Sequence, residues 1–246
     1  MGYKILGISG SPRPKSNTDV MITEALKGAA EVEGVETEMI SLGGKKVMPC
    51  IGCFKCIERK ELCIFRHKDY MAEFYEKWLM ADGIIIGSPV YHLSITGILK
   101  NALDRLGEGL WCLRSTETIE SRWFCKVGGV LTQGMATFGG QELTIQFLVN
   151  HLLLLNCLVV PPEALTVPGV PGSFRNNRVL EGGGIGEWDP GSLEHAQALG
   201  KRVAEVTTIM GAGVERLKDK LPREYLDYVL NKTGYQRIVD NNRKGG

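Results

Sequence analysis

The chain has 246 residues, 43% of them hydrophobic, so it can bury a substantial core as one large domain or as a domain with appendages. Its 29 Lys and Arg residues nearly balance 28 Asp and Glu residues, which gives no indication of a nucleic-acid or membrane-surface partner. Seven cysteines, four of them close together, argue against a secreted disulfide framework in a chain of this size. We recognise no signal peptide at residues 1–8, and the apolar stretch 152–160 is too short to span a bilayer, so we expect a cytoplasmic protein.

Hydrophobic periodicity predicts strands and helices that alternate along the chain. The predicted strands are short apolar runs at 5–8, 35–40, 83–87, 124–131 and 157–160. The predicted helices lie at 19–26, 69–80, 94–106, 140–155 and 192–206. This alternation favours an α/β fold, a doubly wound parallel sheet with helices on both faces. In such a sheet the ligand binds at the carboxyl ends of the strands.

Two later stretches fall outside the alternation. Residues 168–191 are rich in Gly and Pro and hold no clear element, and their length predicts a functional loop, a subunit arm or disorder. Residues 211–246 are predicted to form a helical tail, either a surface helix with a frayed end or an arm that clasps another subunit. One face of that tail would carry Leu221, Tyr225 and Val229.

The first polar loop, between the strand at 5–8 and the helix at 19–26, is a candidate anion site. Free backbone N–H groups and the helix dipole favour negative charge there. The loop contains neither G-x-x-x-x-G-K-[ST] nor G-x-G-x-x-G, and it fits a cradle for one terminal phosphate. The alternative is an ordinary turn capped by Ser16 or Asn17, with Arg13 and Lys15 solvated. The residues assigned to the phosphate are Ser9, Ser11, Pro12, Arg13, Ser16, Asn17 and Thr18.

Two further loops follow the third and fourth predicted strands. In the first, Pro89 fixes the backbone, and Val90 and Tyr91 can offer N–H groups and an aromatic face to a flat ring. In the second, glycines let the backbone approach the polar edge of such a ring. Each loop alone could be a plain turn, and His92 is expected to be solvated rather than to contact a substrate. The candidate residues are Ser88, Pro89, Val90, Tyr91 and His92, and then Thr132, Gln133, Gly134, Gly139 and Gly140 with Gln141.

Four cysteines form the pattern C-x2-C-x2-C-x6-C: Cys50, Cys53, Cys56 and Cys63. Three thiolates at this spacing on a turning backbone can face one cubane, and a fourth further on can close it. The pattern is close to the bacterial ferredoxin run C-x2-C-x2-C-x3-C-P, with a longer last spacer and Ile64 in place of the proline. Structural zinc, a disulfide or packed thiols are the alternatives.

Other cysteines and charges receive structural assignments. Cys112, Cys125 and Cys157 lie outside this cysteine pattern. Cys125 and Cys157 fall in predicted core strands and are expected to pack as small hydrophobes. Asp104 and Arg105, late in the helix at 94–106, are predicted to be surface or interface charges.

The first loop carries a family resemblance. Ser9-Gly10-Ser11-Pro12-Arg13, followed by Ser16-Asn17-Thr18, resembles the flavin phosphate loop of the NADPH-dependent FMN reductase family, a branch of the flavodoxin-like fold. Together with the cysteine pattern, residues 3–210 resemble the iron–sulfur flavoproteins of that family. The resemblance implies a flavodoxin-like five-stranded sheet of order 2-1-3-4-5 in an FMN-binding domain at 1–210. That domain would include the cysteine segment 49–68, and the tail 211–246 would follow it.

The resemblance also implies how the flavin is bound. The loop 88–92 would lie along the isoalloxazine, and the site would be completed across a subunit interface. We therefore expect a homodimer or homotetramer, in which the region of Trp111 and the loop 168–191 are candidates to cover a neighbour's flavin. We expect FMN rather than FAD, because there is one phosphate loop and no fingerprint for an adenosine.

These features predict an electron-transfer flavoprotein in which FMN and a [4Fe-4S] cluster couple one-electron and two-electron partners. The redox partner would be a protein or a small molecule, and the resemblance alone makes NAD(P)H a candidate donor. One alternative is an NAD(P)H-dependent FMN or quinone reductase without a working cluster. Another is a flavin-binding regulatory protein that holds zinc in the cysteine segment. The sequence offers no obvious catalytic acid–base dyad.

Overall fold

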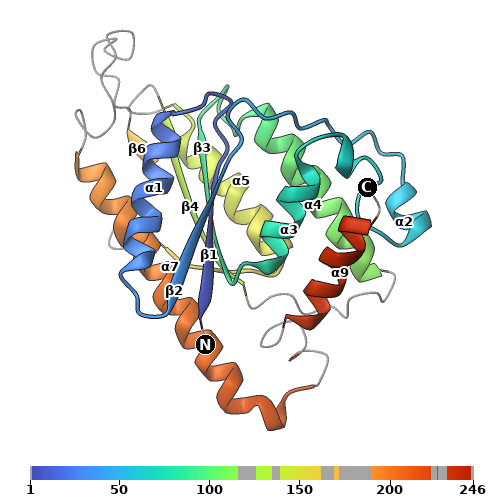
Figure 1. Cartoon of the computed structure of the whole chain (residues 1–246). Helices are drawn as coiled ribbons and strands as arrows, with labels where there is room; N and C mark the ends of the chain where they lie inside the picture. The colour runs from blue at the N-terminus through green and yellow to red at the C-terminus, as the bar shows by residue number, and fades with distance from the viewer. Residues whose placement is uncertain are drawn as a thin grey trace.

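A parallel sheet forms the centre of the molecule, with helices on both of its faces (Figure 1). The computed structural model describes residues 2–115, 126–134, 139–161, 169–171, 190–222, 226 and 232–244. The strands run in the order β2-β1-β3-β4-β5, and every pairing is parallel, which confirms the predicted topology. They are β1 (Tyr3–Ser9), β2 (Val35–Ser41), β3 (Gly83–Pro89), β4 (Val127–Gly134) and β5 (Leu158–Val159).

The helices divide between the two faces of the sheet, as Figure 1 shows. One face is covered by α1 (Asn17–Ala30) and α7 (Pro190–Leu217). The other is covered by α3 (Met71–Met80), α4 (Gly97–Ser115) and α5 (Gln141–Leu154), and α9 (Thr233–Lys244) packs on the outer side of α3 (Figure 1). Alternate residues of a strand point to opposite faces. In β3, Ile85 therefore packs with α1 and α7, whereas Ile84 and Ile86 pack with the other group.

The fourth strand differs from its prediction at both ends. It was expected at 124–131 but spans Val127–Gly134, so Thr132, Gln133 and Gly134 belong to the strand rather than to the loop after it. These three residues pair with an additional short strand, β6 (Gly169–Pro171). The expectation of no element at 168–191 is therefore wrong for residues 169–171. The end of β4, which is far from them in the sequence, offers them the hydrogen bonds of a parallel ladder.

The C-terminal part of the chain packs onto the domain. Helix α7 is longer than the predicted 192–206, and the predicted boundary at residue 210 falls inside it. A short 3-10 turn, η3 (Lys218–Lys220), follows it, and α9 then buries Tyr235 and Val239 in the core beside α3. Of the three residues predicted to share one face of the tail, Tyr225 and Val229 lie outside the described residues. Within the described part of the chain, no helix is both long and apolar enough to cross a bilayer.

Helices α1 and α7 cross at unusually close range, since each has a glycine at the contact. A Cβ on Gly200 would lie 1.6 Å from the carbonyl oxygen of Ala25, and one on Gly28 would lie 2.0 Å from that of Gln197. Gly213, also on α7, has nothing within 4 Å of its Cβ position.

We expect Gly200→Ala to lower the free energy of unfolding by about 1 to 3 kcal/mol, since the added methyl group forces the two helices apart. Gly213→Ala should instead raise it by up to about 1 kcal/mol, because alanine is the better helix former at an open position. Urea unfolding followed by circular dichroism measures both changes. Equal effects of the two substitutions would contradict the close packing of these helices.

Candidate functional site

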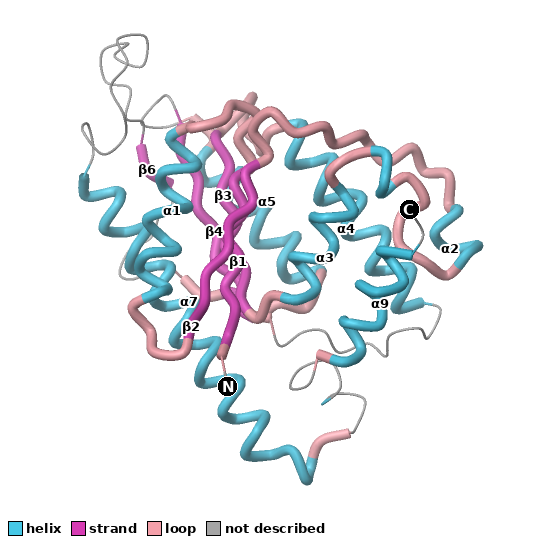
Figure 2. Tube along the Cα trace, in the orientation of Figure 1, coloured by secondary structure: helices cyan, strands magenta, loops and turns pink. Residues whose placement is uncertain are grey.

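Three loops meet at the carboxyl edge of the sheet, at the top of Figure 2. They follow β1, β3 and β4, which are neighbours in the sheet. The N–H of Gly10 donates to the carbonyl of Gly87 at 2.7 Å, and the Thr96 hydroxyl donates to the carbonyl of Gly10 at 2.5 Å. The N–H of Val90 donates to the carbonyl of Gln133 at 2.7 Å. The predicted convergence of the loops is therefore present as direct hydrogen bonds.

The loop after β1 has the shape of an anion site at a helix N-terminus. Ser16 caps α1: its hydroxyl accepts from the N–H of Asp19 at 3.2 Å, and the Asp19 carboxylate accepts from the N–H of Ser16 at 3.0 Å. The buried Ser11 hydroxyl accepts from the N–H of Arg13 and donates to its carbonyl, both at 3.2 Å. The cap is therefore present, and because a cap satisfies only part of the free N–H groups of the first turn, the others are available to an anion.

The predicted phosphate residues occupy different depths in this loop. Ser9, Ser11, Ser16 and Thr18 are buried, Pro12 and Asn17 are half-buried, and Arg13 and Lys15 are exposed. Sequence reasoning missed Gly43, which follows β2. A Cβ at Gly43 would lie 2.6 Å from the backbone nitrogen of Pro14, so the glycine lets the chain support the loop from behind.

Two buried polar atoms at this edge have no hydrogen-bond partner among the described residues. They are the Ser9 hydroxyl, at the end of β1, and the side-chain oxygen of Gln133, near the end of β4. The amide nitrogen of Gln133 donates to the hydroxyl of Thr18 at 3.3 Å, so the glutamine links β4 to the start of α1. An unsatisfied buried polar atom costs about 1–3 kcal/mol. A polar cofactor at this edge would therefore fit the chemistry of the residues present.

The loop after β3 is a tight two-residue turn. The N–H of Tyr91 donates to the carbonyl of Ser94 at 2.8 Å, and the N–H of Ser94 donates back to that of Tyr91 at 3.1 Å. His92 and Leu93 both lie in the left-handed region, with φ of 47° and 65°, where non-glycine residues are strained. The turn leaves Tyr91 42% exposed at the edge, where its ring is accessible to a ligand, and His92 is exposed as well.

Other predicted site residues hold the loops in place. The buried Ser88 hydroxyl donates to the carbonyl of Pro89 at 2.9 Å, and the Thr132 hydroxyl donates to that of Ser88 at 2.6 Å. Gly140 has φ of 99°, and a Cβ there would lie 2.6 Å from the Cα of Leu93. These contacts pack the second loop against the third. The hydroxyls of Ser88 and Thr132 are already bonded to backbone carbonyls of the protein.

The third loop is described on both sides of residues 135–138, which lie outside the described part of the chain. The Gln141 side chain accepts from the N–H of Gly139 at 2.9 Å, and a Cβ on Gly134 would lie 2.5 Å from the Gln141 amide nitrogen. Gly134 and Gly139 therefore stand on either side of one buried glutamine. Gly134 is buried and Gly139 is half-buried. A side chain at Gly134 would collide with the Gln141 amide, so the absence of a Cβ there keeps the glutamine in place.

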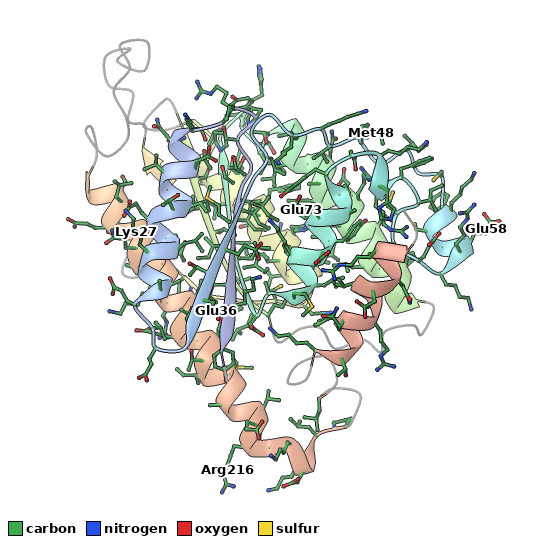
Figure 3. All side chains as sticks on the ribbon, in the orientation of Figure 1. Lys27, Glu36, Met48, Glu58, Glu73 and Arg216 are labelled. Atoms are coloured by element: carbon green, nitrogen blue, oxygen red, sulfur yellow. The ribbon has the colours of Figure 1, made fainter. Side chains whose placement is uncertain are left out.

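The four cysteines of the segment 49–68 line one cavity of about 160 Å³ beside α4. Cys50 and Cys53 are exposed, whereas Cys56 and Cys63 are half-buried. The segment includes a short helix, α2 (Lys55–Arg59), and a 3-10 turn, η1 (Arg66–Lys68). Left-handed residues at Gly52, Phe54 and Lys60 reverse its backbone around the cavity. Helix α2 lies beyond α4, away from the sheet, with Glu58 at the outer edge of the molecule (Figures 1 and 3).

The thiols do not close around a single point. In the described residues, no three His, Cys, Asp or Glu side chains stand close enough together to hold one metal ion. Tetrahedral zinc needs each sulfur about 2.3 Å from the metal. A cubane instead takes one thiolate at each of four irons, so its ligands are spread more widely.

Burial distinguishes the remaining cysteines. The Cys112 thiol on α4 donates to the carbonyl of Cys56 at 2.8 Å, and burial raises its pKa to about 11. Burial also raises the pKa of the Cys157 thiol, to about 12, and this residue is 5% exposed. Cys157 therefore packs as a small hydrophobe, as predicted, just before β5. Cys125 lies outside the described residues.

The prediction for Arg105 is wrong. Its side chain is 1% exposed and forms an ion pair with Asp69, whereas Asp104 is a surface charge paired with Lys100. The guanidinium also donates to the Cys63 thiol at 3.4 Å, so Arg105 belongs to the cysteine site. Helical spacing from the buried Ala102 places Arg105 on the covered side of α4, and that signal could have identified it.

This arrangement defines a class of protein. A doubly wound parallel sheet of order 2-1-3-4-5 is the flavodoxin-like fold, and proteins of this topology bind their ligand at the carboxyl ends of the strands. The solved structure of a flavodoxin, a WrbA-like protein from Agrobacterium tumefaciens, aligns over 85% of this chain and 99% of its own, with a TM-score of 0.52 and 18% identity.

The sequence comparisons name the family. The profile of NADPH-dependent FMN reductase matches residues 3–171. An iron-sulfur flavoprotein of Methanocaldococcus jannaschii is 39% identical over 84% of this chain and 98% of that relative. An iron-sulfur flavoprotein of Archaeoglobus fulgidus is 35% identical over 72% of this chain and 85% of that relative. The chain belongs to the NADPH-dependent FMN reductase family, in its iron–sulfur flavoprotein branch, and is a flavin-dependent oxidoreductase that uses FMN.

Proposed function

We propose that this protein transfers electrons between FMN and a [4Fe-4S] cluster, and so couples two-electron and one-electron redox partners. The observation that carries the proposal is that Cys50, Cys53, Cys56 and Cys63 line one cavity. Three closely spaced cysteines with a fourth further along favour a cubane over a single zinc ion, whose ligands usually come as two pairs from separated turns. The names of the two relatives agree with this choice.

FMN, when bound, exchanges electrons either as a hydride or singly. The protein's part is to hold and orient it. The backbone N–H groups of the loop 10–16 would bind the phosphate, and the Thr96 hydroxyl fixes that loop through Gly10. The unpartnered Ser9 hydroxyl and Gln133 oxygen would bind polar groups of the cofactor. The Tyr91 turn would lie along the ring, and NAD(P)H is the proposed donor.

Anaerobic purification followed by iron, sulfide and zinc analysis and an absorption spectrum tests the proposal. We expect flavin bands together with broad thiolate-to-iron absorption. Flavin without iron, combined with NAD(P)H oxidation, would establish the alternative of an FMN or quinone reductase without a working cluster. Zinc without NAD(P)H oxidation would establish a regulatory protein.

The released cofactor should have the mass of FMN. The physical reason is that one phosphate loop precedes α1 and the chain has no dinucleotide fingerprint. Extraction with acid followed by mass spectrometry decides between FMN and FAD. Recovery of FAD at full occupancy would contradict the assignment of the site.

We also propose a homodimer or homotetramer in a reducing cytoplasm. Beside the cysteine segment, a second cavity of about 710 Å³ is lined by Phe54, Trp111 and Leu154, which are 66%, 52% and 73% exposed. Exposed apolar side chains around a hollow are typical of an interface. None of the six described cysteines forms a disulfide, which agrees with a reducing compartment. Light scattering that gives a monomer mass for the FMN-bound protein would contradict the oligomer.

A further inference from the structure

A buried cation stands against the cysteine cavity. Arg105 comes from α4 and reaches the cysteine segment with both terminal nitrogens. One donates to the carbonyl of Met48 at 3.4 Å and pairs with Asp69, and the other donates to the Sγ of Cys63 at 3.4 Å. Met48 precedes the first cysteine and Cys63 is the last, so this one side chain joins the two ends of the segment. Figure 3 shows Met48 on the side of the molecule that carries α2.

The position of this guanidinium is set from several directions. The Asp69 carboxylate accepts from the N–H of Met48 at 2.8 Å and from that of Met71 at 3.2 Å, so the carboxylate that orients Arg105 is itself held. The hydroxyl of Tyr75 donates to the backbone carbonyl of Arg105, which fixes this turn of α4 to α3. Little freedom remains for the guanidinium to turn away from Cys63.

The charges around the cavity indicate that the Cys63 thiolate would serve as a partner of the buried Arg105 guanidinium. A buried cation costs several kcal/mol unless it is paired and hydrogen-bonded. Asp69 pairs with one terminal nitrogen of Arg105, and its carboxylate also accepts hydrogen bonds from two backbone N–H groups. A second buried cation, Arg66, donates to the carbonyl of Cys63 at 3.2 Å and lies 3.6 Å from Glu61. Glu108 also lines the cavity. The end of Arg105 away from Asp69 has only the sulfur of Cys63 as its acceptor among the described residues.

We infer that Arg105 is a positioning residue for the cluster, which holds the Cys63 thiolate in place and raises the reduction potential of the cluster. This inference rests on the function proposed above. A hydrogen bond to a ligating sulfur withdraws electron density from the iron, and a nearby positive charge favours the more negative, reduced state. Both effects act in the same direction.

Three variants test the inference in the anaerobically purified protein. Arg105→Gln removes the charge and Arg105→Lys keeps it without the planar fork. Lys100→Gln removes a charge from an exposed pair on the same helix. The readouts are iron content and the midpoint potential of the cluster, measured by potentiometric titration with electron paramagnetic resonance detection.

For Arg105→Gln we expect the ratio of reduced to oxidised cluster at the wild-type midpoint potential to fall about tenfold, which for one electron corresponds to about 59 mV. The midpoint potential of the Arg105→Lys protein should lie between those of Arg105→Gln and the wild type, because lysine keeps the charge but lacks the planar fork of the guanidinium. Lys100→Gln should leave the potential and the iron content unchanged.

The outcomes separate the inference from the function on which it rests. Wild-type protein without iron would refute the proposed function itself. Wild-type protein with a cluster, and Arg105→Gln with the same iron content and potential, would overturn only the inference. If Arg105→Gln does not assemble, Arg105→Lys decides: a lower iron content or potential supports the inference, and wild-type values for both overturn it.

Discussion

Cys53→Ala is expected to abolish the iron content of the anaerobically purified protein and to leave FMN bound. A [4Fe-4S] cluster takes four thiolates, and loss of one of the closely spaced three leaves an iron without its protein ligand. The substitution is well placed, because Cys53 is exposed and packs in no core cluster. The cysteine segment lies between β2 and α3, whereas the phosphate loop lies between β1 and α1. Flavin content should therefore survive.

Reduction of this variant by a one-electron donor should fail or slow sharply, while direct hydride transfer to FMN persists. Iron analysis measures the loss of the cluster, the flavin spectrum measures bound FMN, and stopped-flow kinetics measure the rate of reduction. Cys157→Ala is the matched control, because it removes a thiol that packs in the core and lies outside the cavity. It should keep its iron. Normal iron in Cys53→Ala would show that Cys53 is not a ligand, and joint loss of iron and FMN would show that the two sites are coupled in folding.

Ser11→Leu is expected to weaken FMN binding about 10- to 100-fold, a loss of about 1 to 3 kcal/mol. The Ser11 hydroxyl is buried and bonds to both backbone groups of Arg13, so it shapes the loop that would hold the phosphate. Leucine supplies no such bonds, and its bulk obstructs the cradle. Titration of apoprotein with FMN, followed by quenching of flavin fluorescence, measures the dissociation constant.

The control for this experiment is Thr23→Leu, which adds the same side chain at an exposed position of α1. It should bind FMN as the wild type does. Circular dichroism of both variants verifies that the fold is retained. A folded Ser11→Leu protein with wild-type affinity would show that the phosphate lies elsewhere.

The architecture could be predicted from the sequence because its signals are local. Buried strands such as 83–87 are continuous apolar runs, and helices such as 69–80 repeat apolar residues at three and four positions. Short alternating elements leave few ways to build a parallel sheet. The same edge of that sheet must collect the loops after β1, β3 and β4, so the place of the candidate flavin site followed from the order of elements alone.

Contacts between residues far apart in the sequence decided where β4 ends and what supports the phosphate loop. The local pattern at Thr132, Gln133 and Gly134 predicts a loop. They form a strand because Thr132 and Gln133 pair with the end of β3, and because all three pair with β6, 37 residues further along. Gly43 supports the phosphate loop through a contact with Pro14, which no local pattern reveals.

The cysteine site was likewise determined partly by the sequence and partly by the tertiary structure. The spacing of Cys50, Cys53 and Cys56 by itself determined that their thiols could face one centre, because three residues of chain cannot separate them far. The environment of that centre was decided by tertiary structure. Arg105 carries a charge, which alone predicts a solvated side chain. It is buried because folding brings Asp69, 36 residues earlier in the chain, against it. That pairing, together with the hydrogen bonds to Met48 and Cys63, offsets the loss of water around the guanidinium.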